Sequence, residues 1–159
     1  MKYRTGIGYD VHQLRDGLPF YLGGVKVEHT KGAVGHSDAD VLIHAICDAL
    51  LGAANLGDIG KHFPDTDMKY KGIDSKILLK ETYELVKKNG YVIENIDTVL
   101  CLQKPKVAPY LPLMKTTLSN VLGIDEDDIS IKATTTEYLG FEGREEGVSA
   151  LANVLIKTE

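Results

Sequence analysis

One stretch of apolar residues constrains the fold of this chain more than any other feature of the sequence. Between Ser37 and Leu56 the apolar positions at helical spacing are Val41, Leu42, Ala45, Ile46, Ala49, Leu50 and Ala53. This period predicts a helix that packs with one face against a core. Ser37 is expected to cap its N-terminus, with Asp40 three residues later.

The segments around this helix show strand and helix patterns. Strands are expected over 3–10, 20–22, 25–27, 91–102, 129–134 and 148–156, although the last segment also fits a helix. Further helices are expected over 75–88 and 110–122, because Asn89-Gly90 and Gly123 follow them. Gly6 and Gly8 predict that another part of the chain approaches the first strand closely. This order predicts an α/β fold, an α+β sandwich whose helices pack on one face of a small mixed β-sheet.

Length and charge limit the classes of partner. The 159 residues are expected to form one domain, residues 1–159, since a chain of this size buries roughly 70% of its unfolded surface. With 18 Lys and Arg against 23 Asp and Glu, the net charge is −5 and no basic run is present, so we expect no nucleic-acid partner. No apolar run reaches the roughly 20 residues of a membrane helix. Cys47 and Cys101 are expected to be reduced and buried, which favours a cytoplasmic protein.

Three residues form a candidate metal site. Asp10 and His12 lie two apart near the end of a predicted strand, so their side chains leave the same face. His44 lies on the predicted helix, and the three together match the donor set of catalytic zinc with one open position. Asp48, one turn after His44, is expected to accept the second ring N–H of that histidine. The alternative is a solvated helix face, with the Asp-x-His pair accidental.

A candidate phosphate site lies at the start of the same helix. His36 and Ser37 precede it, where free backbone N–H groups and the helix dipole favour an anion. The alternative is that Ser37 only caps the helix. The run from Lys132 to Glu137 adds three hydroxyls and a carboxylate after a predicted strand, although threonines are also ordinary strand formers. The chain has no P-loop lysine and no Gly-x-Ser-x-Gly elbow, which excludes a P-loop phosphate site and acyl transfer by an elbow serine.

Taken together, these motifs resemble a known enzyme family along the whole chain. They are Asp10-Val-His12, His36-Ser-Asp-Ala-Asp40 with His44, Asp48-Ala-Leu-Leu-Gly-Ala, Gly57-Asp-Ile-Gly60, Phe63-Pro-Asp-Thr-Asp67, Lys132-Ala-Thr-Thr-Thr-Glu137 and Gly140-Phe-x-Gly-Arg144. Their order is that of the 2-C-methyl-D-erythritol 2,4-cyclodiphosphate synthases of the non-mevalonate isoprenoid pathway. Each motif alone is weak, whereas the ordered set is highly specific.

The resemblance implies a homotrimer with active sites between neighbouring subunits. It implies a cytidine diphosphate ester of methylerythritol 2-phosphate as substrate, whose 2-phosphate attacks the β-phosphorus and releases CMP. Asp10, His12 and His44 would then hold zinc, and Glu137 would hold Mg²⁺ or Mn²⁺. Because two like charges about 4 Å apart repel by roughly 4 kcal/mol in a partly enclosed site, such a reaction needs cations.

The resemblance also implies roles for individual residues. His36 and Thr135 would be catalytic, with His36 orienting the attacking phosphate and Thr135 lying near the charge that builds in the transition state. The remaining substrate contacts would be Asp10, His12, Ser37, Asp58, Ile59, Gly60, Phe63, Pro64, Asp65, Thr66, Asp67, Thr134, Thr136 and Glu137, with a cytosine pocket from the neighbouring subunit's Leu102, Gln103, Lys104, Pro105, Lys106, Val107 and Ala108.

Two segments are less typical of the family or have a second interpretation. Leu102 replaces a frequently small residue and Val107 replaces Leu or Met, which affects the packing of the base pocket. Phe141 and Arg144, with Glu146, match residues beside a cavity on the trimer axis where an isoprenoid diphosphate binds. The alternative for these residues is subunit packing with an internal salt bridge.

Two other functions fit the same metal ligands. The first is a zinc-dependent phosphohydrolase of a nucleotide-linked substrate, in which the metal activates water. The second is a non-catalytic assembly protein in which a fully ligated metal joins subunits.

Overall fold

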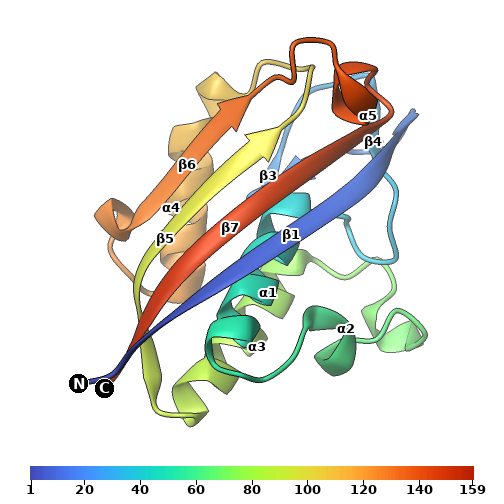
Figure 1. Ribbon diagram of the computed structural model, residues 1–159. Coiled ribbons are helices and arrows are strands. Elements are labelled where there is room, and N and C mark those ends of the chain that lie inside the picture. Colours follow the sequence, from blue (N-terminus) through green and yellow to red (C-terminus); the bar gives the residue numbers. More distant parts are fainter.

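The computed structural model describes residues 1–159 and shows a mixed five-stranded sheet (Figure 1). The strand order is β4-β1-β7-β5-β6, in which only β5 and β6 run parallel. The bounds are Tyr3–Asp16 for β1, Lys31–Ala33 for β4, Tyr91–Cys101 for β5, Ile129–Thr134 for β6 and Gly147–Thr158 for β7. A separate hairpin pairs β2 (Tyr21–Leu22) with β3 (Val25–Lys26) around Gly23 and Gly24.

Three helices lie on one face of this sheet. They are α1 (Val41–Ala53), α3 (Ser75–Lys88) and α4 (Leu111–Leu122), which Figure 1 shows behind the strands. The shorter elements are α2 (Ile59–His62), α5 (Gly140–Gly143), η1 (Met68–Tyr70), η2 (Ala108–Tyr110) and η3 (Glu126–Asp128). The expected layering of helices on one face of a mixed sheet is confirmed, and the final segment is a strand. Strand β4 was not expected from the sequence.

Two glycines allow α1 to lie directly on β1. A Cβ atom at Gly6 would come within 2.0 Å of the Ala49 carbonyl oxygen, and one at Gly8 within 1.9 Å of the Ala45 carbonyl oxygen. No side chain fits at either position, so the backbones of the strand and the helix touch. This confirms the close approach predicted at Gly6 and Gly8 and fixes His44, on α1, near the side chains of β1 that follow Gly8.

The cap of α1 differs from the sequence prediction. The N-cap residue is Asp40, whose carboxylate accepts from the Ile43 backbone N–H at 3.1 Å. The same carboxylate accepts from the backbone N–H groups of Gly23 at 2.9 Å and Gly24 at 2.7 Å. Ser37 was expected in this role, but it lies one turn earlier and its hydroxyl faces His44. Asp40 is the N-cap because its buried carboxylate accepts hydrogen bonds from three backbone N–H groups, and these bonds join the β2–β3 hairpin to α1.

The other face of the sheet has no helix over it (Figure 1). On β1, the residues that point this way include Ile7, Tyr9 and Val11, which are 73%, 52% and 45% exposed. Leu151 of the neighbouring β7 is 39% exposed on the same side. The usual alternation is therefore reversed in β1, because its glycines, Asp10 and His12 face the helix while its large apolar residues face outward.

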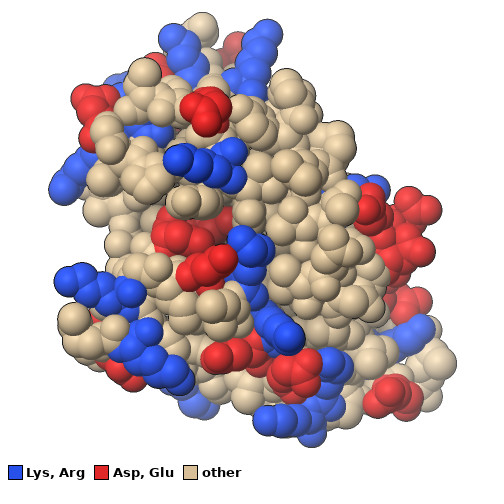
Figure 2. All heavy atoms as spheres, turned by 180° about the vertical axis from the view of Figure 1, so that it is seen from behind, with Lys and Arg blue, Asp and Glu red and all other residues tan.

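The helical side carries both signs of charge. Figure 2 shows lysine and arginine side chains interspersed with acidic ones over this side. None of the helices is both long and apolar enough to cross a bilayer. Both cysteines are free thiols, Cys47 buried and Cys101 half-buried. Burial raises the pKa of Cys47 to about 12.

Candidate metal centre and active site

Asp10, His12 and His44 meet where β1 crosses α1. The Oδ2 atom of Asp10 lies 2.9 Å from Nε2 of His12 and 3.1 Å from Nδ1 of His44. The two ring nitrogens lie 3.1 Å apart. One oxygen and two nitrogens therefore form a compact triangle, as the sequence predicts, and the three side chains are partly buried.

This triangle fits a metal ion. Four ligands at about 2.0–2.1 Å from a tetrahedral zinc ion are separated from one another by about 3.3 Å. The three donor atoms are slightly closer than that and share one side, which leaves a fourth position for another ligand. One carboxylate with two imidazoles also suits other divalent ions of the first transition row.

A backbone contact fixes the tautomer of His12. Its Nδ1 lies 2.9 Å from the Val34 carbonyl oxygen, and since a carbonyl only accepts, Nδ1 carries a hydrogen and donates it. In the neutral ring Nε2 then has a free lone pair that points at Asp10 and His44. Such a contact on the far nitrogen is typical of histidines that bind metal.

Hydroxyl groups, rather than Asp48, contact the far nitrogen of His44. Its Nε2 lies 2.9 Å from Oγ of Ser75 and 3.1 Å from Oγ of Ser37. The expected role of Asp48 is corrected, because its Oδ1 accepts from the Ile59 backbone N–H at 2.7 Å and holds the start of α2. Asp48 thus positions the loop beside the site. Burial raises its pKa.

The charges of the triad are strongly linked. Burial by itself raises the pKa of Asp10, but hydrogen bonds with His12 and His44 and their charges outweigh it and lower the pKa to about 2. Burial by itself lowers the pKa of His12, but the hydrogen bond with Asp10 and its charge raise the pKa above the usual value. The site therefore favours positive charge next to the Asp10 carboxylate.

A cavity of about 520 Å³ opens beside the two histidines. Its walls include most of the predicted residues of this region: His36, Ser37, Ile59, Gly60, Phe63, Pro64, Asp65 and Thr66. His36 donates from Nε2 to the Asp67 carbonyl oxygen at 3.1 Å, which ties its ring to the loop over the cavity. Asp58 and Asp67, two further predicted contacts, do not line this cavity; their carboxylates cap α2 and η1.

The other predicted residues gather in separate cavities at the ends of β5 and β6. Because these strands are parallel, with Cys101 paired to Thr134, the segments that follow them leave the same edge of the sheet. Leu102, Gln103, Pro105, Lys106, Val107, Ala108, Thr134 and Thr135 line a cavity of about 170 Å³, and Lys104 and Glu137 join Thr135 in one of about 580 Å³. Within one chain, neither cavity includes a residue of the metal triad.

One hydrogen bond between the two segments and others within the second segment hold this region together. The Tyr138 backbone N–H donates to Oε1 of Gln103 at 3.1 Å, and the Glu137 N–H donates to Oγ1 of Thr135 at 3.3 Å. Glu137 and Tyr138 adopt φ values of 55° and 62°, which are uncommon for non-glycine residues. The side chain of Glu137 is exposed. Thr136 bonds the Leu139 carbonyl oxygen through its hydroxyl.

Phe141 and Arg144 lie outside all of these cavities. Arg144 forms a two-fold ion pair with Glu146, at 3.1 and 3.2 Å. The ring of Phe141 packs close to Gly147 at the start of β7. The salt bridge that the sequence offered as an alternative for Arg144 is therefore present within the chain.

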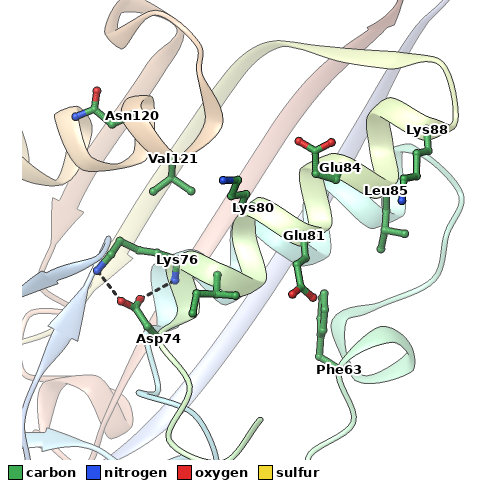
Figure 3. Close-up of a pocket in the computed structure, with 11 residues that line it drawn as sticks. Phe63, Asp74, Lys76, Lys80, Glu81, Glu84, Leu85, Lys88, Asn120 and Val121 are labelled. Carbon is green, nitrogen blue, oxygen red and sulfur yellow. Dashed lines mark hydrogen bonds and ion pairs between the residues drawn. The ribbon is translucent and has the colours of Figure 1, made fainter. Parts of the chain in front are cut away.

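A larger cavity lies away from the metal triad. It measures about 920 Å³ and opens between α3 and α4 (Figure 3). Charged side chains of both signs line it, and Lys76 pairs with Asp74 at 2.9 Å at its edge. The only group of three metal-ligating side chains in the structure is Asp10, His12 and His44, and two of them line the smaller cavity, which makes it the candidate site.

Sequence reasoning missed two residues at the metal centre. Ser75 begins α3 and Asp38 lies in the loop before α1, and both reach the far side of His44. From the sequence, Ser75 is only a serine at the start of a predicted helix, and Asp38 is only an aspartate in the segment before α1. Neither signal indicates that α3 begins beside α1.

Comparison with known proteins places the chain in a family. The sequence pattern of the YgbB family matches residues 3–157. The chain belongs to the YgbB family. A relative from Bacteroides thetaiotaomicron, named 2-C-methyl-D-erythritol 2,4-cyclodiphosphate synthase, is 61% identical over all of both chains. The resemblance drawn from the sequence motifs is thereby confirmed.

Solved structures share this fold. The bifunctional IspDF of Campylobacter jejuni has a TM-score of 0.96 and 45% identity over 99% of this chain, which spans 43% of that longer protein. IspF of Plasmodium falciparum, in complex with CDP, has a TM-score of 0.87 and 34% identity, covering 99% of this chain and 97% of that one. The shared fold therefore extends over nearly the whole chain.

Proposed function

We propose that this YgbB-family enzyme converts 4-diphosphocytidyl-2-C-methyl-D-erythritol 2-phosphate to 2-C-methyl-D-erythritol 2,4-cyclodiphosphate and CMP, in non-mevalonate isoprenoid biosynthesis. The observation that carries the proposal is the triangle of Asp10, His12 and His44, open toward a cavity lined by His36 and Ser37. The name of the Bacteroides relative and the CDP bound by the Plasmodium structure support this substrate.

The reaction joins two anionic groups of one molecule. The 2-phosphate oxygen forms a bond to the β-phosphorus while the bond from that phosphorus to the oxygen of CMP breaks. When bound, zinc at Asp10, His12 and His44 and Mg²⁺ or Mn²⁺ at Glu137 would supply positive charge against the diphosphate. Since the nucleophile is tethered to the electrophile, the enzyme needs no covalent intermediate.

The residues of the chain hold the substrate in a reactive geometry. His36, tied to the loop through the Asp67 carbonyl, orients the attacking phosphate, while Ser37 lies beside it. The segment from Phe63 to Thr66 covers the methylerythritol part and excludes water. Thr135 lies at the diphosphate, and the neighbouring subunit's residues 102–108 surround cytosine.

The complete site forms between subunits of a homotrimer. Each chain has the metal triad at one cavity and residues 102–108 with Glu137 at separate ones, so a head-to-tail ring joins the two halves of each site. The open apolar sheet face, with Ile7, Tyr9 and Val11, supports the same assembly because burying it stabilises the contact. An axial cavity next to Phe141 would take an isoprenoid diphosphate.

Heavy-oxygen water distinguishes cyclisation from its closest alternative. Turnover in H₂¹⁸O is expected to give cyclodiphosphate and CMP without label, because no water oxygen enters either product. A zinc phosphohydrolase must add one labelled oxygen to a product. Label in the phosphate products, read by mass spectrometry, would replace the proposed cyclisation with hydrolysis.

Mixing two inactive variants tests whether the site is shared. His44→Ala removes a triad ligand, while a chain with both Thr135→Val and Glu137→Ala lacks only the other half. Equal mixing by unfolding and refolding is expected to restore about one quarter of the sites, since a site needs an intact triad from one chain and an intact second half from its neighbour, each present about half of the time. Sedimentation should give three times 17.4 kDa. No recovery in mixed trimers would show that each chain holds a complete site.

A further inference from the structure

We infer that Asp38 and Ser75 are positioning residues that select the tautomer of His44 able to bind a metal through Nδ1. The inference deepens the proposed function, because it concerns the affinity of the same metal centre. It follows from the hydrogen bonds of three side chains on the far side of His44, away from Asp10 and His12: Asp38, Ser75 and Ser37.

The hydroxyl hydrogen of Ser75 is already committed. Ser75 is fully buried at the start of α3, and its Oγ donates to Oδ1 of Asp38 in a short hydrogen bond. The other carboxylate oxygen, Oδ2, accepts from the Ser75 backbone N–H at 3.0 Å. A carboxylate that holds both the hydroxyl and the amide of one residue leaves the hydroxyl a single orientation.

The contact with His44 then has only one direction. Nε2 of His44 lies 2.9 Å from Oγ of Ser75, whose only hydrogen points at Asp38. Two lone pairs at that distance repel, so Nε2 carries the hydrogen and Ser75 accepts it. In the neutral ring the lone pair is therefore on Nδ1, the atom that faces Asp10 at 3.1 Å.

Ser37 is compatible with this assignment but does not determine it. Its Oγ lies 3.1 Å from Nε2 and accepts from the Ala39 backbone N–H at 3.2 Å. A hydroxyl with a free hydrogen donates or accepts equally well. The pair of Asp38 and Ser75 is different because the carboxylate has no hydrogen to donate. Ser75 must therefore donate to Asp38, and His44 must donate to Ser75.

The alternative tautomer would oppose metal binding. With hydrogen on Nδ1, His44 would donate to Asp10 and offer no lone pair to the triangle. Groups that hold the second ring nitrogen of a metal-bound histidine change metal affinity by about 10-fold to 100-fold when they are removed. Asp38 also accepts from the Asp40 backbone N–H at 3.2 Å, so the Asp38 carboxylate is held at the start of α1.

The test measures zinc affinity and the tautomer separately. Ser75→Ala removes the acceptor, and we expect zinc, in competition with a chromophoric chelator, to bind about 10-fold to 100-fold more weakly. Long-range ¹H–¹⁵N correlation spectra of the metal-free protein above pH 8 should show less of the Nε2–H form of His44. Ser75→Thr keeps the hydroxyl and should recover most of the affinity.

A matched control and a second variant keep the test decisive. Asp74→Asn changes the N-cap of the same helix without touching His44 and should leave zinc affinity within about 2-fold. Asp38→Asn keeps the volume but has one acceptor oxygen for the two donors of Ser75, so we expect weaker zinc binding even if Ser75→Ala fails to fold.

Each result has a distinct meaning. Wild-type protein that binds no divalent metal would overturn the proposed metal centre itself. Wild-type protein that binds zinc, with Ser75→Ala and Asp38→Asn both as tight as Asp74→Asn and an unchanged His44 tautomer, would overturn this inference and leave the proposed function intact.

Discussion

Nε2 of His12 and Nδ1 of His44 lie 3.1 Å apart, although 32 positions separate the two residues in the chain. Both nitrogens also face the same oxygen of Asp10. Two imidazole lone pairs and a carboxylate oxygen repel one another at such distances unless protons or a cation lie between them. The fold therefore brings together three acceptor atoms, and a metal ion bound between them would remove their mutual repulsion.

Removing His44 should remove zinc without unfolding the chain. His44→Ala is expected to lose stoichiometric zinc and turnover, because the apolar face of α1 is unchanged and only one ligand is lost. Metal content by mass spectrometry, together with circular dichroism, checks this. Retention of one zinc per chain in His44→Ala would show that the ligand set is wrong.

Replacing His36 gives the matched comparison. This histidine lines the same cavity but lies outside the triad, so His36→Ala should keep zinc and lower turnover by about 10²-fold to 10⁴-fold, as expected for a residue that orients a reacting group. Loss of zinc in both variants would mean that the cavity, and not the individual ligand, determines metal retention.

Replacing Glu137 should change the requirement for Mg²⁺ or Mn²⁺ and leave zinc binding unchanged. Glu137→Gln removes a charge from the exposed loop after β6, so the concentration of Mg²⁺ or Mn²⁺ needed for half-maximal turnover should rise about 10-fold or more, with zinc content unchanged. Glu126→Gln, on the exposed turn η3, removes the same charge outside the cavity of Glu137 and should have no effect. Equal divalent-ion titrations in the two variants would contradict the role of Glu137.

The sequence predicted the metal ligands better than the residues that hold these ligands and the neighbouring loop in place. The period of two in β1 placed Asp10 and His12 on one face, and the helical period placed His44 in a polar row on the predicted helix. These patterns suggested the triad but left a solvated helix face as an alternative, and the family resemblance favoured the triad. The roles of Ser75 and Asp48 depend on where α3 and α2 begin relative to α1, which no local period encodes. The capping prediction failed for a similar reason, because Asp40 is selected by donors of a distant hairpin.

Zinc binding should release protons at pH 6. Burial lowers the pKa of His12, but its hydrogen bond with Asp10 raises it above the usual 6.5, so the metal-free protein holds an imidazolium at pH 6. A metal must displace that proton, whereas Asp10, with a pKa of about 2, has none to lose. Zinc affinity is therefore expected to fall as pH decreases below the pKa of His12.

Calorimetry measures the proton release directly. Titration of zinc into metal-free protein at pH 6, in two buffers of different ionisation enthalpy, should give about one proton released per zinc from His12. Binding heats independent of the buffer would contradict coordination through His12. The same titration with His12→Ala should show no tight zinc binding.

Asp40 should be the most costly carboxylate to remove outside the metal centre. Its fully buried side chain accepts from the backbone N–H groups of Gly23, Gly24 and Ile43, so Asp40→Ala leaves three donors without a partner. Each buried donor left unsatisfied costs about 1–3 kcal/mol, and we expect a loss of about 3 kcal/mol or more in the free energy of unfolding. Asp125→Ala removes the cap of the exposed turn η3 and should cost about 1 kcal/mol or less. Urea unfolding of metal-free protein at equal concentrations compares the two, and equal losses would show that the hairpin contacts of Asp40 contribute nothing to stability.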